Sequence, residues 1–177
     1  MFALSRSLPL EPVIASVRAP HTEGEGFTWF PPADAAADVG SSADERFDAV
    51  GETVCALVEW LDSTTSAGVG LLGLSQGGAM ALELMRAQPE RFDYVVQLSG
   101  FVFPSEHPGD AHLAERRPPV FWGRGTDDTA IPSSLIRNTQ EWLAVHSTLT
   151  EGIYEGLGHA VSDTELRELG AFIRAQL

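Results

Sequence analysis

Gly73-Leu74-Ser75-Gln76-Gly77, followed directly by Gly78, is a G-x-S-x-G motif between two contrasting segments. Residues 68–74 are apolar or glycine throughout, which predicts a buried strand, whereas residues 78–85 are good helix formers. A sharp turn between them strains the backbone, and the glycines remove side chains that would clash there. The motif therefore predicts a strand, a tight turn and a helix, with the Ser75 hydroxyl exposed at the end of a sheet.

Strands and helices are predicted to alternate along the rest of the chain. The strands are apolar runs more than strict alternations of apolar and polar residues, as in a mostly parallel sheet covered on both faces. We therefore predict an α/β fold in one domain over residues 1–177, with functional groups at the carboxyl ends of the strands. The predicted strands cover residues 13–17, 68–74, 94–98, 119–122 and 149–154; the predicted helices cover residues 76–88, residues 133 or 134 to 146, and two segments that begin with capping boxes at 42–45 and 162–165; the predicted loops cover residues 21–38 and 99–117.

Composition limits the possible partners and compartments. The formal net charge of −14 argues against nucleic acid and anionic membrane surfaces as partners. No apolar run reaches the roughly 18 residues of a membrane span, and the amino terminus lacks a secretory pattern, so we expect a cytoplasmic protein without stable membrane insertion. Cys55 is the only cysteine, which excludes an intramolecular disulfide, and its apolar neighbours predict a buried, inert thiol.

Three residue types that together activate a hydroxyl follow one another along the chain. A serine hydroxyl becomes nucleophilic when a histidine accepts its proton and an acid orients that histidine. His159 follows the last predicted strand, between glycines that fit a turn, and either Asp127 or Asp128 supplies an acid after the strand at 119–122. We therefore predict that Ser75, one of these acids and His159 meet at one rim of the sheet. The other four histidines have no comparable setting, and no metal site is expected.

Several further segments make the whole chain resemble the phospholipase/carboxylesterase family of α/β-hydrolases, which includes the acyl-protein thioesterases. In this family the catalytic acid stands three positions after a glycine and four before a proline, and this selects Asp128 between Gly125 and Pro132. Family members often have a histidine where this chain has Arg124. The segments that match in order are residues 17–20, the loop with Trp29 and Phe30, residues 72–81, Ser99-Gly100, residues 125–132 and residues 156–159.

The resemblance implies an α/β-hydrolase fold and a serine carboxylesterase that hydrolyses short- to medium-chain esters through an acyl-enzyme. Ser75 is the implied nucleophile, His159 the base and Asp128 the acid, and the backbone N–H of Gln76 is the expected oxyanion donor. No cofactor is implied, the expected partner is a small-molecule ester, and a homodimer is suggested by the family alone. Four aromatic residues are candidates for the wall of the acyl pocket: Trp29, Phe30, Phe101 and Phe103.

One part of the family pattern is not found in this sequence. The second oxyanion donor of the family lies in a loop after a strand that ends in His-Gly, and no His-Gly-x-Gly sequence occurs here. We therefore expect an amino-terminally shortened family member that lacks the strand between those at 13–17 and 68–74. These two strands would then close on each other, stay apart or recruit another strand.

Two alternatives share the same residues. An acyl-thioesterase or lysophospholipase uses the same catalytic groups and differs only in its leaving group. A catalytically silent remnant of a hydrolase would keep these residues without a working oxyanion hole and act as a binding or dimerising module.

Overall fold

The computed structural model of the protein describes residues 13–31, 43–64 and 68–177. These residues form two compact units, one of residues 13–16 and 68–177 and the other of residues 17–31 and 43–64. The organisation of residues 1–177 as one domain stays a prediction.

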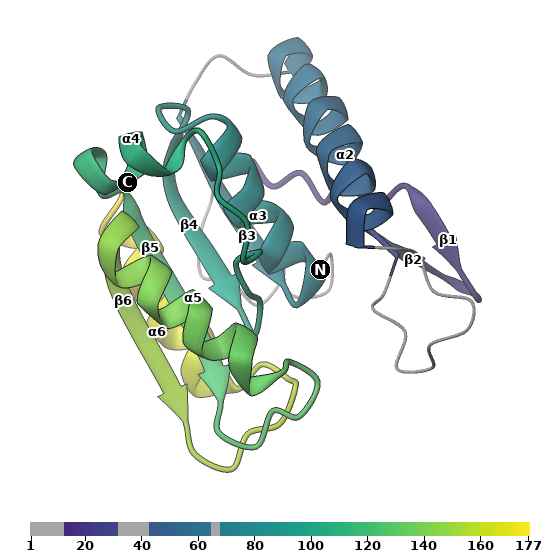
Figure 1. Cartoon of the computed structure of the whole chain (residues 1–177). Helices are drawn as coiled ribbons and strands as arrows, with labels where there is room; N and C mark the ends of the chain where they lie inside the picture. Colours follow the sequence, from purple (N-terminus) through teal and green to yellow (C-terminus); the bar gives the residue numbers. More distant parts are fainter. Residues whose placement is uncertain (1–12, 32–42, 65–67) are drawn as a thin grey trace. The chain divides into compact units, whose positions relative to one another are not determined.

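The larger unit is built on a parallel sheet with the strand order β3-β4-β5-β6 in the part of the chain that is described (Figure 1). Helices connect successive strands, as parallel pairing requires. In chain order the elements are β3 (Val69–Leu74), α3 (Gln76–Ala87), β4 (Phe92–Leu98), α4 (Asp110–Arg116), β5 (Pro119–Gly125), α5 (Ser133–His146), β6 (Thr148–Tyr154) and α6 (Asp163–Arg174).

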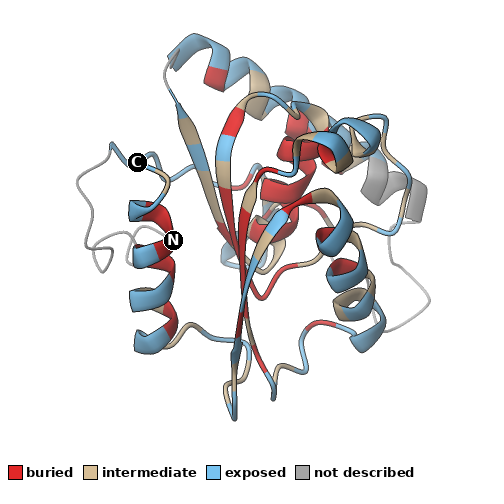
Figure 2. Cartoon of the chain, turned by 90° about the vertical axis from the view of Figure 1, so that its left-hand side faces the viewer, coloured by how far each residue is buried: buried red, intermediate tan, exposed pale blue. Residues whose placement is uncertain are grey.

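The sheet of the larger unit has a hydrophobic core on each face. Alternate residues of β4 and β5, among them Val96, Leu98 and Phe121, pack against α6. The opposite face is covered by α3, which is buried along most of its length, and by α5 (Figure 2). Both faces of the central strands are therefore closed to water, which explains why these strands read as continuous apolar runs.

The smaller unit contains an antiparallel pair, β1 (His21–Glu23) and β2 (Gly26–Thr28), and the helix α2 (Ala43–Thr64). The Thr53 hydroxyl of α2 donates to the carbonyl of Trp29 at 3.4 Å, which joins the helix to the segment after β2. No helix in the described residues is long and apolar enough to cross a membrane.

Most of the predicted elements are confirmed. The strands predicted at 68–74, 94–98, 119–122 and 149–154 correspond to β3 to β6, with β4 and β5 longer than expected. The capping box at residues 162–165 is also present, because the Ser162 hydroxyl accepts from the N–H of Glu165 and the Glu165 side chain accepts from the N–H of Ser162. The capping box predicted at 42–45 begins at Ser42, outside the described residues.

The strand predicted at residues 13–17 is wrong. These residues belong to no strand or helix and pair with no strand among the described residues, and Val13, Ile14 and Val17 are exposed. A β-branched run favours extended backbone, but a strand also needs a neighbour for its N–H and C=O groups. Within the described residues, β3 is consequently an edge strand.

Both segments predicted as loops contain short regular elements. The loop at 21–38 begins with the hairpin β1–β2, and the loop at 99–117 contains α4. Asp110 opens α4 and accepts two hydrogen bonds of 2.8 Å from Arg86. A partner 24 residues away thus supports a seven-residue helix that its own propensity would not stabilise.

Two smaller predictions are also corrected. Neither Ser133 nor Ser134 caps α5, because the helix begins at Ser133 and Pro132 occupies the capping position. Cys55 is exposed rather than buried. It follows the buried Val54 by one residue, and 100° of helical rotation turns it away from the buried stripe of α2.

Glu165 is a buried carboxyl group at the start of α6, only 1% exposed. Gly123 on β5 leaves the space that its Oε1 atom occupies, and this oxygen has no hydrogen-bond partner. Burial raises the pKa of Glu165 to about 7, the hydrogen bond from Ser162 opposes this rise, and the charge of Glu168 adds to it. Glu165 is therefore held in its neutral form below pH 7.

Glu165 should make the stability of the larger unit depend on pH. With a pKa of about 7 when folded and 4.5 when unfolded, its favourable contribution is complete below pH 4.5 and is lost as the pH rises through 7. We expect Glu165→Gln, which keeps a capping-box side chain, to remove about 3 kcal/mol of this pH dependence. Urea unfolding at pH 5 and pH 8 measures the difference.

The control for this prediction is Asp163→Asn, which removes an exposed carboxylate from the same helical turn. It should keep the wild-type pH dependence. A Glu165→Gln protein that loses as much stability as the wild type between the two pH values would contradict the assignment.

Candidate active site

Ser75 lies at the turn between β3 and α3 with a backbone conformation that side chains rarely adopt, φ 55° and ψ −122°. Its N–H donates to the carbonyl of Leu98 at 2.8 Å, and its carbonyl accepts from Ala79 at 3.1 Å. A non-glycine residue in such a region costs about 1–3 kcal/mol, so the surrounding structure must hold it there. The predicted strand, turn and helix are thus present, with the serine at the carboxyl end of β3.

Gly73, Gly78 and Gly100 create the space for this turn. A Cβ atom on Gly73 would overlap the backbone of Gly77. A Cβ atom on Gly100 would lie 3.0 Å from both the Cα of Gly78 and the carbonyl oxygen of Ser75. The turn is therefore closed by backbone-to-backbone packing between β3, α3 and the segment after β4.

The side chain of Ser75 is not used by the helix that follows it. Serine at a helix N-cap commonly accepts a hydrogen bond from the first helical turn, but Ser75 makes no side-chain cap. Ser75 as a residue is half-buried. The backbone N–H of Gln76, the first residue of α3, lies at the positive end of the helix dipole.

Hydrogen bonds between two loops bring Asp128 and His159 together. The loop after β5 joins the loop after β6 through Thr126, whose N–H donates to Tyr154 at 3.0 Å and whose hydroxyl accepts from Gly156 at 2.8 Å. The N–H of Asp127 donates to Leu157 at 3.0 Å. A residue after β5 is thereby fixed opposite a residue after β6.

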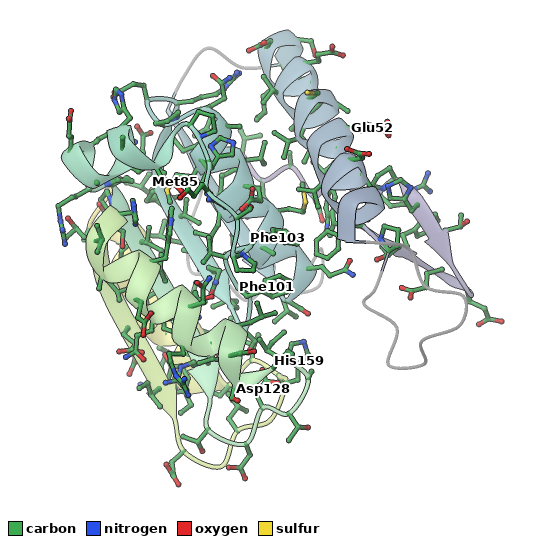
Figure 3. The ribbon with its side chains drawn as sticks, in the orientation of Figure 1. Glu52, Met85, Phe101, Phe103, Asp128 and His159 are labelled. Atoms are coloured by element: carbon green, nitrogen blue, oxygen red, sulfur yellow. The ribbon has the colours of Figure 1, made fainter. Side chains whose placement is uncertain are left out.

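The His159 ring faces the Asp128 carboxylate, with Nδ1 2.8 Å from Oδ2 (Figure 3). The carboxylate is 2% exposed and the imidazole 29% exposed. A carboxylate accepts hydrogen bonds, so this contact assigns the proton to Nδ1 and leaves Nε2 as an acceptor.

The environment of Asp128 keeps its carboxylate charged. Burial alone would raise its pKa, but the hydrogen bond from His159 and the 2.9 Å hydrogen bond from the N–H of Ala130 oppose this and bring the pKa below its usual value. The buried Ser99 hydroxyl also lowers the pKa of Asp128, although the two groups are not aligned well enough to form a regular hydrogen bond. Asp127, the other acid considered from the sequence, is exposed and accepts a 3.1 Å hydrogen bond from Thr126.

The structure joins two of the three residues expected to form a relay. No hydrogen bond links Ser75 with His159, although both follow strands of the same parallel sheet at its carboxyl edge. Among the aromatic candidates, Phe101 and Phe103 contact each other edge to face, with ring centroids 5.3 Å apart. Trp29 and Phe30 belong to the smaller unit, and their place in an acyl pocket stays a prediction.

Two hollows on the surface of the larger unit are lined by residues other than Ser75, Asp128 and His159. Hollows of about 520 and 420 Å³ lie beside α6, one against β5 and β6 and the other at the loop after β6. Neither includes Ser75, Asp128 or His159, so the strained serine and the hydrogen-bonded pair of the Asp128 carboxylate and the His159 imidazole define the candidate site instead. Among the described residues, no group of three or more His, Cys, Asp or Glu side chains is arranged to hold a metal ion.

Sequence reasoning missed Arg86, a fully buried cation in α3. It forms ion pairs of 2.8 Å with Glu83 on its own helix and with Asp110 on α4. Its guanidinium also donates to the carbonyls of Phe103 and Ser105, at 3.4 and 2.5 Å. The available signal was a charged residue within the apolar run after the G-x-S-x-G motif.

Comparison with known proteins places the chain among hydrolases. The family model described as phospholipase/carboxylesterase matches residues 14–177. The chain is 30% identical over 156 residues to carboxylesterase SOBER1 of Arabidopsis thaliana, covering 85% of this chain and 68% of that protein. It is 27% identical over 112 residues to acyl-protein thioesterase 1 of Saccharomyces cerevisiae, covering 59% of this chain and 48% of that protein.

Solved structures confirm the predicted α/β-hydrolase fold. The carboxylesterase of Bacillus cereus superposes with a TM-score of 0.78 at 16% identity, over 99% of this chain and 81% of that one. At this identity the likeness speaks for the fold alone.

The glycine packing around Ser75 yields a prediction on stability. Gly73→Ala places a methyl group inside the Gly77 backbone, so we expect a loss of about 3 kcal/mol or more in the free energy of unfolding. Gly158→Ala is the matched control, because a Cβ atom there has one neighbour at 4.0 Å. Equal urea midpoints for the two variants would contradict the packing described for the turn.

Proposed function

Because the chain belongs to the phospholipase/carboxylesterase family of α/β-hydrolases, we propose that it is a serine hydrolase of carboxylic esters with short to medium acyl chains. The observation that carries the proposal is the pairing of Asp128 with His159 at the same sheet edge as the strained Ser75 turn. Each residue follows a different strand of one parallel sheet, which is where α/β folds place their reacting groups.

In the proposed reaction, the Ser75 hydroxyl oxygen attacks the carbonyl carbon of the ester while its proton passes to Nε2 of His159. The tetrahedral intermediate then collapses, the bond to the alcohol breaks, and His159 returns the proton to the leaving oxygen. Water repeats the sequence on the acyl-enzyme and releases the carboxylic acid. The reaction needs a hydrogen bond between Ser75 and His159, and catalytic hydrogen bonds of this kind often form or tighten only when substrate binds.

Asp128 and Gln76 have supporting roles in this proposal. The charged carboxylate holds the imidazole in the tautomer with a free Nε2 and stabilises the imidazolium that forms. The N–H of Gln76 at the start of α3 donates to the oxyanion, assisted by the helix dipole.

Thioesters form a second candidate substrate class. The two relatives differ in the substrate class that their names state, since one is a carboxylesterase and the other an acyl-protein thioesterase. The chain spans 68% of the first and about half of the second, 48%. Turnover of matched ester, thioester and lysophospholipid substrates with one acyl chain separates these activities.

Ser75→Ala should abolish both hydrolysis of p-nitrophenyl esters and labelling by a fluorophosphonate probe, because it removes the only oxygen proposed to attack the substrate. Turnover is followed by nitrophenolate absorbance and labelling by in-gel fluorescence. A labelled Ser75→Ala protein would contradict the nucleophile, and wild-type labelling without turnover would favour the silent remnant.

Asp128→Asn should lower kcat by about 10⁴-fold while the protein stays folded, because an amide can hold the wrong imidazole tautomer. Asp127→Asn provides a matched control one residue earlier, at an exposed carboxylate, and should leave kcat unchanged. Steady-state kinetics on one ester tests both. The reverse result would transfer the role to Asp127.

A further inference from the structure

The segment after β4 is held by hydrogen bonds from two helices. Within this segment Val102 is fully buried, and its N–H donates to the hydroxyl of Thr139 on α5 at 2.9 Å. The carbonyl of Val102 accepts from the Asn138 side chain at 3.4 Å. Thr139 is itself fully buried, and its hydroxyl donates a hydrogen bond to the carbonyl of Leu135 at 2.8 Å, so this hydroxyl both accepts and donates.

Arg86 holds the next part of the same segment from α3. Its guanidinium donates to the carbonyls of Phe103 and Ser105, while Glu83 and Asp110 balance its charge. The guanidinium is wholly buried, and the Trp142 ring of α5 lies 5.5 Å from its carbon atom. Side chains of two helices thus hold four of the five peptide units between Phe101 and Glu106.

The same segment begins beside the proposed nucleophile. Gly100 packs directly against Gly78 and the carbonyl of Ser75. Phe101 and Phe103 flank the buried Val102 in the chain, and the contact between their rings places both side chains on a common side of the segment. Both rings are partly exposed and contact each other edge to face. Figure 3 shows Phe101 and Phe103 between α3 and α5. Asp128 and His159 lie beyond Phe101, toward the carboxyl edge of the sheet.

We propose that residues 101–105 form a preset wall for the acyl chain, and that Thr139 and Arg86 are positioning residues that set the preference for acyl-chain length. The inference rests on the proposed esterase function, since it assigns the wall to the acyl group bound at Ser75. An aromatic pair on a fixed backbone gains apolar contact area with each methylene added to the acyl chain, and each buried methylene strengthens binding. A two-carbon acyl group ends before it can use this surface.

Thr139→Val tests the wall without changing side-chain size, because it replaces the hydroxyl with a methyl group and leaves the N–H of Val102 without its acceptor. We expect KM for p-nitrophenyl octanoate to rise about tenfold, with kcat for p-nitrophenyl acetate unchanged. Thr139→Ser, which restores the acceptor, should return the octanoate KM close to the wild-type value. The exposed Gln140→Ala on the same helix serves as the control and should match the wild type.

Asn138→Ala is the milder variant if Thr139→Val fails to fold, and it should change chain-length preference in the same direction to a smaller extent. Equal losses on acetate and octanoate, or an unchanged profile in a folded variant, would overturn the proposal. A wild-type protein with neither turnover nor fluorophosphonate labelling would overturn the esterase function itself, which is a different outcome.

Discussion

The backbone of Ser75 is the constraint on which the rest of the site depends. Its left-handed conformation persists because Gly73, Gly78 and Gly100 allow three backbone segments to touch, and because its N–H is held by Leu98 on the neighbouring strand. The same packing fixes both the start of α3 and the start of the segment after β4. The proposed oxyanion donor, the proposed nucleophile and the proposed acyl wall are therefore all positioned by this one packed turn.

The proposed acid and base are positioned by a second set of contacts, the hydrogen bonds between the segments that follow β5 and β6. These bonds bring Asp128 to His159 in a setting where hydrogen bonds to the carboxylate outweigh the effect of burial on its pKa. The two partners differ in their separation from solvent: the carboxylate is 2% exposed, whereas the imidazole is 29% exposed. Such a separation suits a relay that moves a proton to and from bound substrate.

The parts of this fold that could be predicted from sequence are those with a local cause. The apolar run before Ser75, the glycines around it and the capping box at residues 162–165 each specify their own structure. Residues 13–17 could not be judged in this way, because a strand depends on a neighbour that the sequence does not identify. The helix α4 and the role of Arg86 were missed for the same reason, since Asp110 lies 24 residues from Arg86. The contact between Asp128 and His159 could be expected only from chain order and family resemblance, because it spans 31 residues.

The most direct test of this account is to find the residue that carries the acyl group during turnover. The wild-type protein is incubated briefly with p-nitrophenyl octanoate, quenched in acid, digested and mapped by tandem mass spectrometry. We expect the octanoyl mass on Ser75 alone, and its absence from a Ser75→Ala digest. An acyl group on another side chain, or ester turnover that persists in Ser75→Ala, would contradict it.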